Sequence, residues 1–266
     1  MVIDFHTHAF PDNIHERAVG SLVTASRNRL RPYHNGSLSG LLSSMNNFGV
    51  DLSVVQPVIT KPSQTKHLNE WAAKITEENK NIISFGGIHP HSPTWKEDID
   101  FVCSLGLRGL KFHCEYQNFK VDDPFMLKIY DYAFSKGLII LHHAGYDPAF
   151  RAPFKSSPRM FYNVSKAMQG GVMIAAHLGG IKQWRRVEKY IVGTNIYIDT
   201  SMGQGLYDSK QFLRIVKNHG ADKILFGSDS PWGNAKFELE KFNSLPLTDE
   251  ERELILHKNA EKLLNI

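Results

Sequence analysis

The sequence predicts an α/β fold, a single (β/α)8 TIM-barrel domain over residues 1–266. Three observations lead to this prediction. Short apolar runs alternate with longer amphipathic stretches along the chain, the runs number eight, and several histidines and an aspartate stand where those runs end. The length of 266 residues also agrees with the roughly 250 residues of a typical barrel.

The eight apolar runs are the predicted strands. Parallel strands separated by helices favour a sheet closed into a barrel. The alternative is an open doubly wound sheet, but no glycine-rich phosphate loop follows the first run, which counts against its nucleotide-binding form. The predicted strands are Val2–Phe5, Leu52–Val58, Ile82–Ile88, Gly106–Phe112, Leu138–His142, Val172–Ala176, Ile196–Asp199 and Lys223–Phe226.

Most intervals between the strands can hold a helix. Thr248 and Glu251 form a capping-box pattern that predicts the start of the last helix. Gly137 and Gly220 stand where a glycine would end a helix before the next strand. Apolar residues at helical spacing predict helices over Phe125–Ser135, Ile181–Ile191 and Leu206–Asn218.

The composition is that of a globular protein, with 42% hydrophobic and 22% charged residues and a net charge of +4. Basic and acidic residues are interleaved, which argues against a nucleic-acid partner. No apolar run approaches the roughly 20 residues of a membrane span, and nothing resembles a signal peptide. Cys103 and Cys114 are too few for a disulfide scaffold and are expected as half-buried thiols in or near the fourth strand. We therefore expect a cytoplasmic protein without a membrane partner.

Four predicted strands end in side chains that bind metals. The first ends in Asp4-Phe5-His6-Thr7-His8, and residues two apart on a strand point to the same side. The others end in His142-His143, in His177 and in Asp229. Imidazoles with one carboxylate suit Zn, Fe, Mn or Co, and such an ion lowers the pKa of a bound water to roughly 7.

These pieces together resemble the amidohydrolase superfamily, in particular its amidohydrolase-related branch, which includes aminocarboxymuconate-semialdehyde decarboxylase. No single piece is specific, but their order and strand placement are. The matching segments are Asp4 to His8, Gly109 to His113 with Gln117 and Phe119, His143-Ala144-Gly145, Ala176 to Gly180, Asn195 to Thr200, and Phe226 to Trp232.

The resemblance implies a mononuclear metal site. His6, His8 and His143 would ligate one divalent ion, with zinc preferred and manganese, iron or cobalt as alternatives. Asp229 would be the fourth ligand, or would lie beside the water and take its proton. His177 would be a general acid/base. His143 is selected because the family's ligand directly precedes a small residue and glycine.

Other residues have assignments that the sequence leaves open. His142 should point outward, as a core histidine bonded to the backbone. Lys111 either contacts substrate or, carboxylated, bridges a second ion as in binuclear relatives. His113 shares its strand face and is expected to touch substrate. Trp232 could wall the pocket, and Arg151, or Arg159 in the same segment, could clamp a substrate carboxylate.

Three functions agree with this set of sequence motifs. The first is hydrolysis of an amide, ester or lactone in a small molecule by an activated water. The second is non-oxidative decarboxylation of a small carboxylic acid. The third is a non-catalytic barrel with a relict site, which the intact set of histidines and Asp229 argues against. Relatives are often dimers, so the resemblance allows a homodimer.

Overall fold

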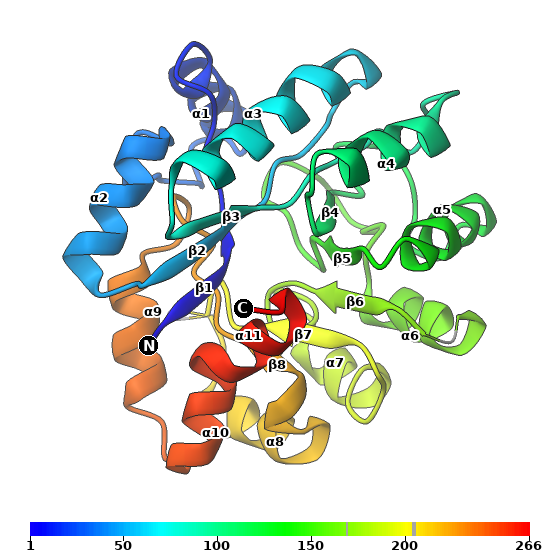
Figure 1. The fold of residues 1–266 in the computed structure, drawn as a ribbon. Coiled ribbons are helices and arrows are strands. Elements are labelled where there is room, and N and C mark those ends of the chain that lie inside the picture. Colours follow the sequence, from blue (N-terminus) through cyan, green and yellow to red (C-terminus); the bar gives the residue numbers. More distant parts are fainter. Residues whose placement is uncertain (169, 204–205) are drawn as a thin grey trace.

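The computed structural model describes residues 1–168, 170–203 and 206–266. Strands and helices alternate along the chain, and the helices surround a ring of parallel strands (Figure 1). The strands are β1 Ile3–Thr7, β2 Leu52–Val55, β3 Ile82–Ser84, β4 Gly109–Phe112, β5 Ile139–His142, β6 Val172–Ala175, β7 Tyr197–Asp199 and β8 Ile224–Leu225. Seven of the predicted strands contain the observed one, and the first overlaps β1, which extends two residues further to Thr7.

Backbone contacts at two places close the ring. Strands β1 to β3 form one sheet and β4 to β8 another. A parallel bridge between Gly86 and Leu110 joins β3 to β4, and a second bridge between Thr7 and Ser230 joins β1 to the segment after β8. The amide of Phe5 also donates to the carbonyl of Phe226 at 2.9 Å. These contacts make the (β/α)8 barrel that the sequence predicts.

Several predicted strands are longer than the observed ones for local reasons. Gly106 adopts φ +72° and its amide donates to the carbonyl of Cys103 at 2.9 Å, so it ends the preceding helix and β4 starts later. Pro57 has no amide proton to continue β2. The amide of Phe226 bonds to the carbonyl of Ile255 at 2.8 Å, outside the strand ladder.

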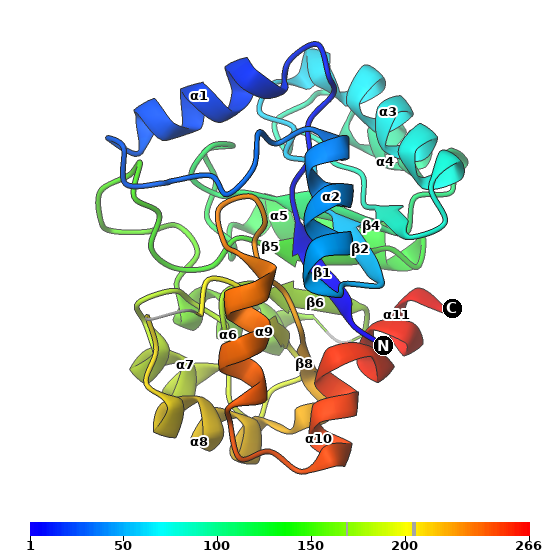
Figure 2. The same cartoon turned by 90° about the vertical axis from the view of Figure 1, so that its left-hand side faces the viewer.

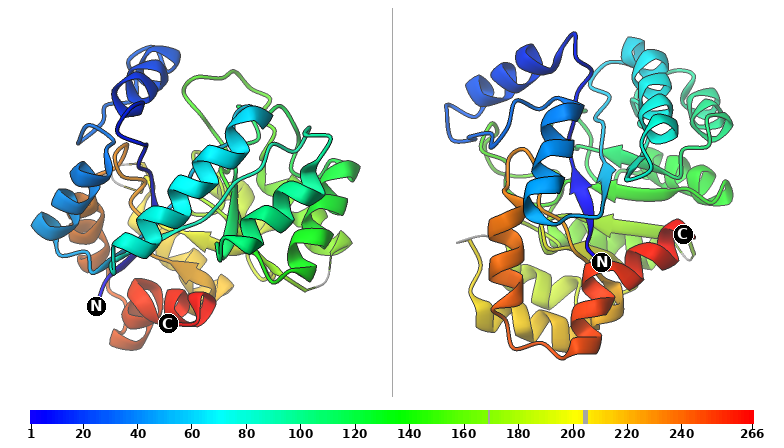
Figure 3. Two further views of the ribbon diagram at one scale, coloured as in Figure 1. Left: turned by 45° about the horizontal axis from the view of Figure 1, so that its top comes forward. Right: turned by 60° about the vertical axis from the view of Figure 1, so that its left-hand side comes forward.

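The helices pack around the outside of the strands, and the two chain ends lie close together (Figures 2 and 3). The helices are α1 His15–Ala25, α2 Leu38–Phe48, α3 Thr65–Glu78, α4 Trp95–Ser104, α5 Pro124–Ser135, α6 Pro158–Ala167, α7 Trp184–Tyr190, α8 Ser209–His219, α9 Ala235–Asn243, α10 Asp249–Glu253 and α11 Asn259–Leu264. Short 3-10 turns cover Pro62–Gln64 (η1) and Ala221–Lys223 (η2), and a π-helical turn (η3) covers Leu254–Lys258.

The helix signals read from the sequence occur in the structure. Thr248 and Glu251 form the capping box at α10, and Gly137 follows α5 with φ +76°. The predicted helix Ile181–Ile191 is shorter at its start, because the amide of Ile181 donates to the carbonyl of Ala144 at 3.0 Å. The chain from His177 to Gln183 is therefore a turn, not helix.

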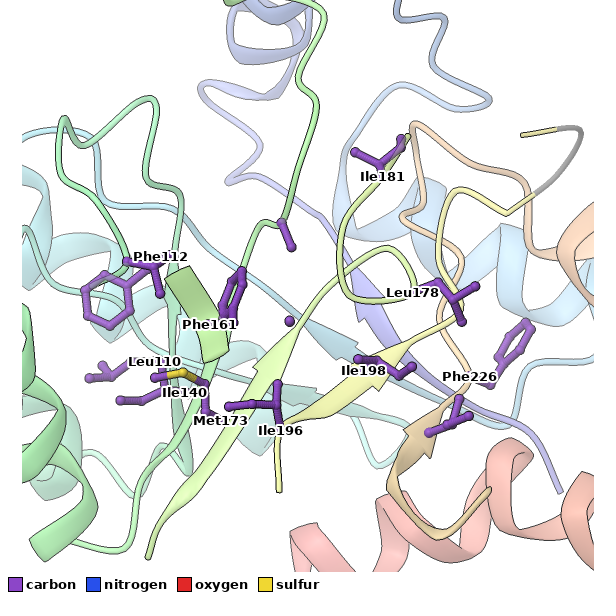
Figure 4. Close-up of a cluster of buried hydrophobic side chains, with 14 of the residues drawn as sticks. Leu110, Phe112, Ile140, Phe161, Met173, Leu178, Ile181, Ile196, Ile198 and Phe226 are labelled. Atoms are coloured by element: carbon purple, nitrogen blue, oxygen red, sulfur yellow. The ribbon is translucent and has the colours of Figure 1, made fainter. Parts of the chain in front are cut away.

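Two apolar cores hold the barrel together. The larger lies between the strands and the helices, and Figure 4 shows part of it, with Leu110, Phe112 and Ile140 from β4 and β5 beside Phe161 of α6. The smaller core joins Phe5, Leu141 and other strand residues to Leu264 of α11. Because α11 also packs on β8, it covers the end of the barrel where the strands begin.

The two cysteines lie apart. Cys103 is half-buried in α4, whereas Cys114 is fully buried just after β4, and both are free thiols. Only Cys114 thus occupies the predicted place near the fourth strand. Among the described residues, no helix is long and apolar enough to cross a membrane.

Candidate active site

His6, His8 and Asp229 meet at the carboxyl ends of β1 and β8. Oδ1 of Asp229 lies 3.1 Å from Nε2 of His8 and 3.3 Å from Nε2 of His6. One ligand atom from each residue lies within 4.8 Å of the others, which is a spacing that one ion can bridge. The pairing of β1 with β2 shifts register between Asp4 and Thr7, yet both histidines reach the same carboxylate.

Hydrogen bonds on the far side of each ring fix how these histidines face Asp229. Nδ1 of His6 lies 2.9 Å from Oδ2 of Asp199, and Nδ1 of His8 lies 2.8 Å from the backbone oxygen of Gln56. Each oxygen is an acceptor, so each Nδ1 carries the proton and donates it. The Nε2 lone pairs are therefore directed at Asp229, as they are in histidines that bind metals.

A chain of hydrogen bonds links Asp199 to His143. The hydroxyl of Ser201 donates to Oδ1 of Asp199 in a very short contact, and it accepts from Nδ1 of His177 at 2.8 Å. Nε2 of His177 can then accept a proton from Nδ1 of His143 at 3.0 Å. This leaves Nε2 of His143 buried and without a partner among the described residues. This buried atom is therefore free to bind a ligand.

Lys111 of β4 lies inside the barrel beside His6. Its Nζ is 2.9 Å from Nε2 of His6, and the side chain is only 2% exposed. Burial lowers the pKa of Lys111 to about 8, while the carboxylates of Asp229 and Asp199 act to raise it. The charges of these two carboxylates thus favour the ammonium form of Lys111.

Burial controls the charge of the site. It lowers the pKa values of His6, His143 and His177, so these rings are neutral at pH 7 and have lone pairs to offer. Burial alone would raise the pKa of Asp229, but the nearby His6, His8 and His177 together hold it well below its usual range. A neutral imidazole set around one carboxylate suits a divalent transition metal.

Asp4 and Gly227 shape the end of β8. The carboxyl of Asp4 accepts the amide of Ser228 at 2.9 Å and also its hydroxyl, and burial raises the pKa of Asp4 to about 7. A Cβ at Gly227 would lie 2.9 Å from Cβ of His6, so glycine is required for the chain after β8 to lie this close to β1. Together they place Asp229, which has φ +65°, opposite β1.

The site opens into a cavity of about 720 Å³. Three of the four predicted substrate contacts line it, namely Lys111, His113 and Trp232. Arg151 is exposed and is not among the lining residues, because the chain leaves the cavity after Pro148. The remaining lining residues include Gln56, Tyr116, Tyr146, Asp147 and the basic side chains of Arg17 and Lys61.

The full-length match decides the family. The sequence fits the amidohydrolase family model over residues 3–266. The chain belongs to the amidohydrolase family. This confirms the family, the barrel and the enzyme class, a hydrolase or carboxy-lyase, that the sequence predicted. No curated protein matches the sequence.

Solved structures share the fold of this amidohydrolase along its whole length. An uncharacterized TIM-barrel protein, Bb4693 from Bordetella bronchiseptica, has a TM-score of 0.77 at 19% identity, covering 99% of this chain and 98% of that one. A probable 2-pyrone-4,6-dicarboxylic acid hydrolase from Acinetobacter baumannii has a TM-score of 0.70 at 16% identity, covering 100% and 99%. A D314N mutant of 5-carboxyvanillate decarboxylase LigW2 from Novosphingobium aromaticivorans, with bound manganese and 3-methoxy-4-hydroxy-5-nitrobenzoic acid, has a TM-score of 0.72 at 13% identity, covering 100% and 97%.

Two histidines of the amidohydrolase differ in their surroundings. His142 points outward, as predicted, and stacks on Phe112 at 5.2 Å, but its Nδ1 lies 3.7 Å from the thiol of Cys114 and not on the backbone. Burial lowers the pKa of His142 to about 3. His113 faces the cavity, where its Nε2 lies 3.2 Å from the carboxylate of Asp147.

Asp199, Ser201 and Asp147 are site residues that were not predicted from the sequence. Asp199 ends a predicted strand, as the other site residues do, so its position was an available signal. Ser201 and Asp147 come from loops, and no spacing rule connects them to the histidines.

Proposed function

We propose that this amidohydrolase is a metal-dependent hydrolase that cleaves an amide, ester or lactone bond in a small molecule. The observation that carries the proposal is the orientation of His6 and His8. Both rings donate through Nδ1 to fixed oxygens and direct Nε2 at the carboxylate of Asp229. Metal-binding histidines are held in the same way.

One divalent ion is the expected cofactor, with zinc preferred over manganese, iron or cobalt. His6, His8 and Asp229 would hold it. His143, whose Nε2 has no partner among the described residues, would be the fourth ligand, although its ring nitrogens group with His113 and Asp147 in this structure. Such an ion acidifies a water molecule and polarises a carbonyl oxygen. The proposal takes Lys111 as an ammonium group beside His6 and not as a carboxylated bridge to a second ion.

The side chains around this set would move the protons. Asp229 is ionised, so it can orient the nucleophilic water and accept its proton. His177 is neutral, its Nδ1 donates to Ser201, and its Nε2 lies 3.0 Å from Nδ1 of His143, so it would exchange a proton with substrate through Nε2 once the contact with His143 opens. Lys111 supplies a positive charge for the oxyanion that develops when the carbonyl is attacked.

The cavity indicates the kind of substrate. Leu22, Leu30 and Trp71 give it an apolar wall, whereas Arg17 and Lys61 bring positive charge. A ring-bearing molecule with an acidic substituent would satisfy both surfaces. The proposed substrate is therefore a small, anionic and partly apolar compound.

Decarboxylation of a small carboxylic acid is the second candidate. The buried ammonium group of Lys111 could hold a carboxylate beside the metal ligands, and His177 could protonate carbon after carbon dioxide leaves. Support comes from the structural similarity to LigW2, a decarboxylase whose structure holds manganese and a nitrobenzoic acid.

Metal analysis and product analysis test these proposals in turn. We expect about one equivalent of a divalent metal in the purified protein, and loss of that metal in a His6→Ala, His8→Ala variant. The metal-loaded protein is then screened against lactones, esters, amides and aromatic carboxylic acids. Acid release without carbon dioxide supports hydrolysis, and carbon dioxide release supports decarboxylation. A protein that binds neither zinc, manganese, iron nor cobalt contradicts both.

A further inference from the structure

A second cavity, of about 950 Å³, lies beside the active site. We call it the rim cleft, and it is lined by Phe154, Arg159, Lys182, Gln183, Trp184, Arg185 and Arg186, with neighbouring residues. These residues come from the segment after β5, the first turn of α6, the turn after β6 and the start of α7. No described residue lines both this cleft and the active-site cavity.

The rim cleft has an excess of positive charge. Arg159, Lys182, Arg185 and Arg186 line it, and Asp122 is the single acidic residue among the described lining. No described carboxylate lies within 4.0 Å of any of these four cations, since the ion pairs found lie elsewhere.

The acidic residues nearest the rim cleft already form hydrogen bonds with other side chains. The carboxylate of Asp122 accepts the side-chain amide of Asn163 at 2.7 Å. Glu188 of α7 accepts from Arg214 at 2.8 Å and from Gln211 at 2.9 Å. These bonds hold the pKa of Glu188 down, and Arg185 adds a smaller effect through its charge. The cationic surplus of the cleft is therefore not neutralised within the chain.

Two further features suit a bound molecule. The aromatic side chains of Phe154 and Trp184 give the cleft apolar surface beside its cations. The side-chain oxygen of Gln183 is buried without a partner among the described residues, so it can accept a hydrogen bond only from a ligand that also carries a donor, such as a hydroxyl or a protonated acid group. The cleft thus offers cations, an acceptor and a contact surface in one place.

The turn that carries His177 separates the rim cleft from the active site. The indole nitrogen of Trp184 donates to the backbone oxygen of His177 at 3.2 Å. Nζ of Lys182 lies 4.1 Å from the ring centroid of Tyr146, which lines the active-site cavity. The two cavities are neighbours with a shared wall.

We propose that the rim cleft binds a small molecule that carries at least two phosphate or carboxylate groups. Like charges gathered on one surface repel one another, and an anion relieves that repulsion. Guanidinium groups also pair with both kinds of oxyanion through two parallel hydrogen bonds. This inference goes beyond the proposed reaction and does not depend on it.

Calorimetric titration of the full-length protein with inorganic pyrophosphate and with succinate tests the proposal. The titrations are run on the protein as isolated and again after chelator treatment, because an anion bound to an active-site metal is lost with that metal. The test variant is Arg159→Gln, Arg186→Gln. The matched control is Arg108→Gln, an exposed arginine that precedes β4 and does not line the cleft.

We expect one molecule of at least one probe to bind, before and after chelation, and to bind more weakly as salt is added. Affinity should fall about tenfold or more in the double variant and stay within about twofold in Arg108→Gln. A stronger response to pyrophosphate indicates a phosphate ligand, and a stronger response to succinate indicates a carboxylate ligand.

Three results would overturn the proposal. They are no binding at millimolar probe, binding equal in the wild type and the double variant, or binding that disappears with the metal. Light scattering adds a fourth: if the double variant changes the oligomeric state of the protein, the cleft is an interface between chains and not a ligand site.

Discussion

Asp199 holds His6 through a contact of 2.9 Å between Oδ2 and Nδ1, although 193 positions separate the two residues in the chain. The same carboxylate accepts the amides of His177 and Ser201, each at 3.0 Å. One buried acid therefore orients a candidate metal ligand and the candidate acid/base together.

Replacing Asp199 with asparagine should weaken metal binding about 10- to 100-fold while the barrel stays folded. The amide can place an N–H against Nδ1 of His6 and so allow the ring to turn or change tautomer. Competition with a metal chelator measures the affinity, and circular dichroism checks the fold. Asp12→Asn, at an exposed acid after β1, is the control. Unchanged affinity in Asp199→Asn would show that this contact does not orient His6.

His177→Asn should retain the metal and lose turnover by about 10²–10⁴-fold. The variant loses the proton-transfer group but keeps every proposed metal ligand. Metal analysis and kcat on the substrate identified by the screen measure the two effects separately. Turnover that survives largely intact would remove His177 from the acid/base role.

Ser201→Ala should lower kcat by about tenfold with a smaller change in KM, since the hydroxyl accepts the Nδ1 proton of His177 at 2.8 Å. The variant should also shift the pH profile of kcat, because Nδ1 of His177 loses its partner. Ser201→Thr keeps a hydroxyl and should restore much of the rate. If alanine and threonine behave alike, the hydroxyl has only a packing role.

Gly145→Ala should destabilise the protein by about 2–3 kcal/mol. Gly145 adopts φ +91°, and a Cβ there would lie 2.6 Å from both the backbone nitrogen and oxygen of Ile181. Gly193 is a matched control, because it has φ +81° but open space around its Cβ position, so alanine there should cost only about 1 kcal/mol. Urea unfolding measures the stability of both variants. Equal losses of stability would mean that the backbone near Ile181 moves away from the new Cβ without cost.

Acid should destabilise the fold through His219. This buried ring donates to the backbone oxygen of Ile196 at 2.8 Å and accepts the amide of Gly193 at 3.2 Å, so it is built into the structure as a neutral group. Burial, with Lys223, lowers its pKa from 6.5 to about 4. The unfolded chain therefore binds more protons between pH 6.5 and 4, and stability falls as the pH drops through that range.

Full titration of His219 should lower the free energy of unfolding by about 3 kcal/mol, because burial lowers its pKa from 6.5 to about 4. Urea unfolding of the wild type and of His219→Gln at pH 7.5 and pH 5 measures it. The loss of stability on acidification should be smaller in the variant. Other histidines with lowered pKa values, such as the partly buried His34, keep some acid sensitivity in both proteins. An equal loss in both would exclude His219 as a contributor.

The strands could be predicted because each carries its own apolar pattern and needs no distant contact to be recognised. Candidate site residues such as His6 and Asp229 could be named because they follow predicted strands and lie in segments that match the family. Arg17 could not, because its place at the cavity depends on how α1 packs across the barrel mouth. Arg151 was chosen from its position in the sequence alone, and the path of the loop after Pro148 carries it elsewhere.

Closure of the barrel brings β1 against the segment that follows β8, and Asp229 reaches His6 and His8 only there. During synthesis, the two histidines leave the ribosome more than two hundred residues before their carboxylate partner. A nascent chain therefore lacks the assembled ligand set until its last strand has emerged. A chain that binds the metal through this set would therefore have been translated past β8 and would have closed its barrel.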